Sequence, residues 1–84
     1  MSETAKPVPQ TKGVQVRYVI VHYPMMFTEI LVEYKDTGKR QQIEHRYDWG
    51  TAREYCRQSL KERGIEPVIE RPEPYTETFP WVTI

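Results

Sequence analysis

The stretch DWGTAREYCRQSLKERG, residues 48–64, decides the fold. Thr51 and Glu54, three residues apart, form a capping box in which each side chain accepts a backbone N–H at the helix start. Asp48, just upstream, places a negative charge at the positive end of the helix dipole. Gly64 can take the left-handed conformation that ends many helices. The stretch therefore predicts one helix with a defined beginning and end.

The apolar side chains of this helix form one narrow stripe. They recur at the three- and four-residue spacing of a single helical face, at Ala52, Tyr55, Cys56, Ser59 and Leu60. Charged and amide side chains cover the rest of the helix. Because so narrow a stripe buries little area by itself, the pattern predicts a helix that lies on a sheet.

Three strands are predicted before the helix. Residues 14–23 (VQVRYVIVHY) are rich in β-branched and aromatic side chains, and their second half is apolar on both faces, which predicts a central strand. Residues 27–35 form a second strand and residues 40–47 a third. The Asp36-Thr37-Gly38 sequence between them is good turn chemistry and predicts a hairpin.

Alternation along these strands predicts which side chains face the helix. In the second strand these are Thr28, Ile30, Val32 and Tyr34. In the third strand, alternation predicts one outer face that carries Arg40, Gln42, Glu44 and Arg46.

The chain divides into three parts by composition. We expect a disordered N-terminal tail at residues 1–13, an α+β domain at 14–71, and an extended segment rich in proline and aromatic residues at 72–84. Residues 65–71 (IEPVIER) read as a short fourth strand, which Pro67 confines to an edge or a bulge. The last segment suits either an added edge strand or a peptide laid across a partner.

The expected fold class is therefore α+β. It is a small two-layer fold in the order β-β-β-α-β, with one helix packed on one face of an antiparallel sheet.

Composition limits the cellular compartment and the classes of partner that the chain suits. Twelve basic residues balance twelve acidic ones, which removes the simplest argument for nucleic-acid binding. The single cysteine fits a reducing compartment, and the N-terminus lacks the apolar region of a secretory signal. No apolar run approaches the roughly 20 residues that cross a bilayer. We expect a cytoplasmic protein without a membrane partner.

Catalytic and metal-binding patterns are weak. Cys56 lies on the apolar stripe, where an inert buried thiol is expected rather than a nucleophile working with His45. His22 and His45 lack the further donors that a metal site needs. We therefore expect no catalytic residue, no metal and no cofactor, and a protein that is not an enzyme.

Large apolar residues without an evident place in the core point to protein binding. Methionine and aromatic side chains adapt to partner surfaces and bury large areas. The candidate protein-binding residues are Met25, Met26, Phe27, Phe79 and Trp81. They suit an adaptor or inhibitor that docks on a larger protein assembly. The alternative is that the C-terminal residues fold back and cap the sheet; the pattern does not determine an oligomeric state.

A second hypothesis is a module that binds single-stranded nucleic acid. Aromatic side chains on a sheet can stack on bases while arginines hold phosphates. The candidates, on the outer sheet face, are Arg17, Arg40, Arg46 and Trp49. Glutamates on the same face also suit an ordinary solvated surface.

The stretch from Arg40 to Pro72 loosely resembles small phage proteins that bind and inhibit host RNA polymerase. The shared features are the order strand, acidic turn, helix, glycine, strand and the final Glu70-Arg71-Pro72. The resemblance implies a phage-type inhibitor of host machinery and assigns no functional residue.

Overall fold

The computed structural model describes residues 13–84 and shows an antiparallel sheet with one helix. The elements in chain order are β2 (Gln15–Tyr23), β3 (Phe27–Tyr34), β4 (Arg40–Arg46), α2 (Trp49–Glu62), β5 (Glu70–Glu73), β6 (Thr76–Thr78) and β7 (Val82–Thr83). This confirms the predicted α+β class. The tail expected at residues 1–13 lies outside the described residues, except for Gly13.

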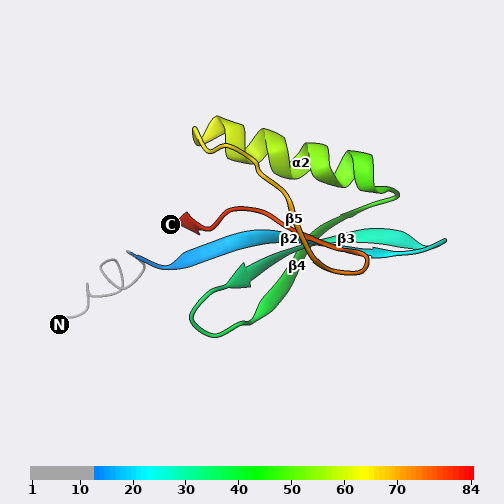
Figure 1. The fold of residues 1–84 in the computed structure, drawn as a ribbon, viewed down its shortest axis with the longest axis horizontal. Helices are drawn as coiled ribbons and strands as arrows, with labels where there is room; N and C mark the ends of the chain where they lie inside the picture. The colour runs from blue at the N-terminus through cyan, green and yellow to red at the C-terminus, as the bar shows by residue number, and fades with distance from the viewer. Residues whose placement is uncertain (1–12) are drawn as a thin grey trace.

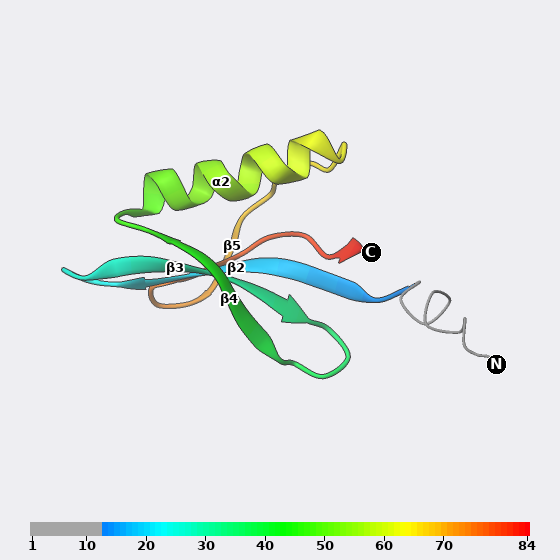
Figure 2. The same cartoon turned by 180° about the vertical axis from the view of Figure 1, so that it is seen from behind.

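The six strands form one sheet in the order β4-β3-β2-β6-β5, and β7 also pairs with β2. The helix α2 lies along one face of this sheet (Figure 1), and no helix of residues 13–84 covers the opposite face (Figure 2). Strand β2 has β3 on one side and both β6 and β7 on the other. Its apolar second half is explained by this central position.

The core lies between α2 and the middle of the sheet. The register pairs Ile20 with Ile30, and both side chains are completely buried. From the helix, Cys56 and Leu60 reach the same cluster. Thr28, at the end of the same face of β3, is also buried. The helix-facing side of β3 and the apolar stripe of α2 are thus confirmed.

A bulge in β4 overturns the predicted alternation of that strand. Ile30 pairs with Glu44 and the next residue, Leu31, pairs with Gln42, so Ile43 is an extra residue. An extra residue exchanges the two faces for everything that follows it. Arg46 consequently pairs with Thr28 on the helix side, whereas Gln42 remains on the outer face.

The C-terminal segment belongs to the sheet. β6 pairs with residues Val19–Val21 of β2, and β7 pairs with its beginning at Gln15 and Val16. Phe79 lies between β6 and β7 and enters the core, where it is 3% exposed. Residues 72–84 are therefore part of the sheet, although their composition differs from that of residues 14–71. Without them, the second edge of β2 would have no backbone hydrogen-bond partners.

The strand expected at residues 65–71 is mostly absent. Only Glu70 and Arg71 belong to a strand, as the beginning of β5, and β5 occupies the edge of the sheet. Pro67 has no N–H for a ladder, and Pro72 lies within the edge strand β5, where a missing N–H is tolerated. The edge position predicted from Pro67 applies, but the strand begins later.

The caps of α2 differ in part from the predicted ones. Asp48 is the N-cap, and its carboxylate accepts the backbone N–H of Thr51 at 2.9 Å. The Thr51 hydroxyl donates to the same carboxylate at 3.1 Å instead of capping the helix itself. The Asp48 carboxylate caps the helix in place of the Thr51 hydroxyl because Asp48 lies three residues before the free Thr51 N–H, which is the usual N-cap spacing. Gly64, at φ 75°, follows the helix end as predicted.

Candidate functional site

Two tight turns lie at the same end of the molecule, where β2 finishes. In the first, between β2 and β3, the Met26 N–H donates to the Tyr23 carbonyl at 3.0 Å across Pro24 and Met25. Met25 has φ 64°, in the left-handed region that side chains other than glycine rarely adopt. Proline followed by a residue of positive φ is the pattern of a type II turn.

The second turn, between β5 and β6, repeats this pattern with Pro74 and Tyr75. Glu73 pairs with Thr76 across it, and Tyr75 has φ 56°. The His22 N–H donates to the Tyr75 carbonyl at 2.8 Å, which joins this turn to the end of β2. Each turn thus holds a large side chain where glycine is the usual residue.

Exposed apolar side chains gather at this end. Among residues 13–84, eight large hydrophobic side chains are exposed, and five belong to the two turns or to the connection from β4 to α2. We call these five the turn surface: Tyr23, Met25, Met26, Tyr47 and Tyr75. Met25 is fully exposed and Met26 is 69% exposed. Figure 1 shows the two turns and the helix start at the same end of the molecule.

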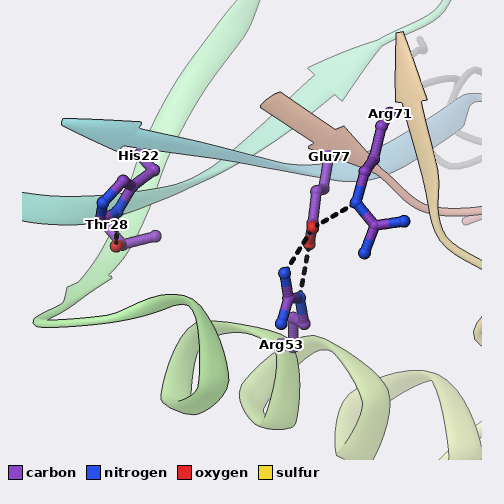
Figure 3. Close-up of polar contacts among 5 residues, drawn as sticks. All are labelled: His22, Thr28, Arg53, Arg71 and Glu77. Carbon is purple, nitrogen blue, oxygen red and sulfur yellow. Dashed lines mark hydrogen bonds and ion pairs between the residues drawn. The ribbon is translucent and has the colours of Figure 1, made fainter. Parts of the chain in front are cut away.

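His22, next to the turn surface, contacts Thr28, Trp49 and Tyr75. The His22 Nδ1 lies 2.7 Å from the Oγ1 of the buried Thr28 (Figure 3). The His22 ring stacks on Trp49 at 5.0 Å between centroids and lies 6.2 Å from the ring of Tyr75. The histidine therefore links the helix start with the β5–β6 turn, which is the satisfied structural role its strand position suggests.

A buried carboxylate connects α2 to the β5–β6 hairpin. The Arg53 Nε and Nη2 donate to the two Glu77 oxygens at 2.8 and 2.6 Å, and the Arg71 Nε donates at 3.0 Å (Figure 3). The Glu77 side chain is only 2% exposed. Burial by itself raises the pKa of this carboxyl, but the hydrogen bonds and charges of Arg53 and then Arg71 outweigh it, so the pKa lies below its ordinary value.

An open cavity of about 600 Å³ lies between α2 and this hairpin. The residues around it are Trp49, Arg53, Arg71, Pro72, Glu73, Pro74, Tyr75, Thr76 and Glu77. Tyr75 belongs both to the cavity wall and to the turn surface. The cavity therefore adjoins the turn surface.

The structure separates the five candidate protein-binding residues. Met25 and Met26 are exposed, and the half-buried Phe27 packs its ring 5.0 Å from that of Tyr23. Phe79 is a core residue, so its ring is not accessible in this fold. Trp81 is half-buried away from the turns, with the Arg17 guanidinium 4.3 Å from its ring centre. Core packing is thus the role of Phe79, and the exposed methionines remain as candidates.

The four candidate nucleic-acid contacts do not share one face. Arg17 and Arg40 both bind the Glu33 carboxylate of the outer face. The bulge turns Arg46 to the helix side, where its guanidinium lies 5.1 Å from the Tyr55 ring centre. Trp49 lies at the helix start against His22. The predicted position of Arg46 on the outer face is therefore wrong, and nucleic-acid binding stays a prediction.

Other kinds of chemistry would depend on the Cys56 thiol or on clusters of metal-ligating side chains. The Cys56 thiol is completely buried, and burial, with a smaller contribution from Glu77, raises its pKa to about 12. It is therefore protonated at neutral pH, as its helix position suggests. Residues 13–84 contain no group of three or more His, Cys, Asp or Glu placed to hold a metal ion. In that range no helix has the length and apolar character needed to cross a membrane.

Sequence reasoning missed three residues of the turn surface, Tyr23, Tyr47 and Tyr75, and the partners of Glu77. A usable signal existed for Tyr75, because a proline followed by a residue between two strands indicates a turn that displays that residue. No sequence pattern indicates the pairing of Arg53 with Glu77, because the two residues are 24 positions apart in the chain. Comparison of the chain with protein-family models, with curated proteins and with solved structures gives no match.

Proposed function

We propose that this chain is a non-enzymatic binding protein that docks on a larger protein through the turn surface, as an adaptor or an inhibitor. The observation that carries the proposal is the fully exposed Met25 side chain on a backbone of positive φ. A left-handed backbone costs an ordinary residue about 1–2 kcal/mol. Glycine would avoid most of that cost, and the chain displays methionine instead.

Backbone strain of this kind concentrates at functional sites, where the surrounding structure holds it. Pro24 restricts the φ angle before Met25, and the hydrogen bond from Met26 closes the turn. Tyr75 repeats the arrangement beside it. Two strained turns with displayed side chains, side by side, support a surface that is rigid before it binds.

The chemistry of the turn surface favours a protein partner. Methionine adapts its three side-chain torsions to a partner, and tyrosine adds large area with a polar end. Tyrosine and methionine are both enriched at interfaces. A prearranged backbone also reduces the ordering cost of association.

The test starts with capture of partners from a lysate of the natural host and identification of what is retained. Binding of the purified partner is then measured for Met25→Gly and for Met25→Ser with Met26→Ser. We expect each to weaken binding at least about tenfold, as loss of a central anchor does. Val68→Ser is the matched control, since Val68 is 57% exposed and lies outside the turn surface.

Stability separates the two roles of Met25. Met25→Gly relieves backbone strain, so we expect it to melt at or above the temperature of the parent while it binds less well. Unchanged binding by both methionine variants, with folded protein, would eliminate the turn surface as the docking site.

A further inference from the structure

We propose that the cavity between α2 and the β5–β6 hairpin binds a carboxylate side chain from an acidic segment of the partner protein. The inference rests on the proposed function and names the chemistry of the partner. It starts from Arg71, which belongs to β5 and is 64% exposed.

Arg71 is held in place and still has donors to offer. Its Nε donates to Glu77, and within residues 13–84 no hydrogen bond uses its two terminal nitrogens. In Figure 3 the contact with Glu77 is made by the Nε of Arg71, and no contact is drawn from its two terminal nitrogens. The planar fork of arginine matches the two oxygens of a carboxylate, and less freedom is lost when that fork is already oriented.

Glu77 supplies the orientation. Its carboxylate is buried, and Arg53 binds both of its oxygens, so the acceptor for Arg71 is fixed by the helix. Arg53 and Arg71 carry two positive charges against the single negative charge of Glu77, so this ion-pair group has an excess of one positive charge; Glu73 on the same wall makes the wall as a whole neutral. The arrangement positions a cation without neutralising it.

A peptide carboxylate fits this charge better than a free anion. Glu73 also borders the cavity, and its charge opposes any bare anion that approaches. A peptide offsets that repulsion with apolar contacts, for which the wall offers Pro72, Pro74 and Tyr75. Prolines lose little freedom on contact, which favours such packing.

The cavity is less suited to a nucleobase. Trp49 and Tyr75 are the large aromatic side chains of the wall. His22 stacks on the Trp49 ring and lies 6.2 Å from the Tyr75 ring, and Arg53 lies 5.2 Å from the centre of the Trp49 ring. Stacking of a base requires an accessible ring face. The Arg71 side chain, by contrast, is 64% exposed and so is accessible to a carboxylate.

The experiment titrates two peptides into the ¹⁵N-labelled protein and follows the arginine Nε–Hε and tryptophan indole signals. The probes are acetyl-Leu-Glu-Leu-Glu-Leu-amide and the same peptide with glutamine at both glutamates. We expect the glutamate peptide to shift the Arg71 signal and the glutamine peptide to leave it in place.

Variants locate the binding. Arg71→Gln should weaken the glutamate peptide at least about tenfold, because removal of a charged partner is costly. Arg57→Gln, on the same helix as Arg53 but not bordering the cavity, should bind as the parent does. Thermal melting confirms that each variant is folded.

Other outcomes overturn the inference. Equal binding of the two peptides, or a glutamate peptide that Arg71→Gln still binds with parental affinity, removes the carboxylate site. Inorganic phosphate or a single-stranded oligonucleotide that shifts Arg71 more strongly than the peptide assigns the cavity to another ligand. Met25→Gly should leave the peptide titration unchanged, so failure of the cavity is distinguishable from failure of the turn surface.

Discussion

Replacement of Glu77 by glutamine should destabilise the fold more than any other change of a charged side chain on the β5–β6 hairpin. Its carboxylate accepts two hydrogen bonds from Arg53 and one from Arg71 while it is 2% exposed. Glutamine keeps the size of the side chain but removes the charge and one acceptor. Arg53 then loses its bidentate partner.

The magnitude follows from the exposure of the charges left behind. Breaking a buried ion pair by removing one partner costs about 3–5 kcal/mol. Here Arg53 is 27% exposed and Arg71 is 64% exposed, so water partly solvates both after the change. We therefore expect a loss of about 2–3 kcal/mol in the free energy of unfolding, a sizeable share for a domain of this length. This corresponds to a fall of roughly 10–20 °C in melting temperature.

The pH dependence has a definite sign. Because the pKa of the Glu77 carboxyl is lower in the folded state than its ordinary value of 4.5, its contribution is fully present above that value. The contribution is lost as pH falls through the lower folded-state pKa. The gap in stability between the parent and Glu77→Gln should therefore be widest near pH 7 and shrink below about pH 4.5.

Urea denaturation followed by circular dichroism, at several pH values, measures this gap. Glu73→Gln is the matched control, because Glu73 is exposed on the same hairpin and forms no ion pair within residues 13–84. A Glu77→Gln protein that is as stable as the control at pH 7, or a gap that widens in acid, would refute the reasoning.

Three further predictions follow from the caps, the C-terminal segment and the arginines. Asp48→Ala should lower the melting temperature more than Thr51→Ala does, because the Asp48 carboxylate caps the helix; the reverse order would favour Thr51 as the cap. Phe79→Ala should cost about 3–5 kcal/mol in urea denaturation, as for a buried ring, and Trp81→Ala about 1–2 kcal/mol. Equal losses would contradict their different burial. If the protein binds single-stranded oligonucleotides, affinity should fall steeply with salt and weaken in Arg40→Ala, and filter binding that detects no complex at low salt would exclude it.

Local sequence determined the elements because their signals lie within a few residues of each other. The helix between Asp48 and Gly64 and the turn at Gly38, whose φ is 75°, were predictable from caps, periodicity and turn chemistry. The helix-facing side of β3 followed from simple alternation. The central position of β2 was predicted from the apolar side chains on both faces of its second half, and its pairing with β3 on one edge and with β6 and β7 on the other confirms it.

The tertiary structure alone decided where the chain pairs across long separations. Nothing local distinguishes residues 76–83 as partners of β2 from the same residues as a free peptide, because both states suit an extended, proline-rich segment. Their place depends on the open edge of β2 and on the space that Phe79 fills in the core. The bulge at Ile43 was also decided by the tertiary structure, since it depends on the pairing register between β3 and β4.

The candidate site shows the same division. Exposure of Met25 and Met26 was predictable from their place after Pro24, next to a strand end. Their position beside Tyr75 was not predictable. It requires β6 to run antiparallel beside β2, which brings the β5–β6 turn to the same end of the molecule. The burial of Glu77 also has no local cause: a glutamate in a short strand is ordinarily exposed, and here the helix supplies Arg53 above it.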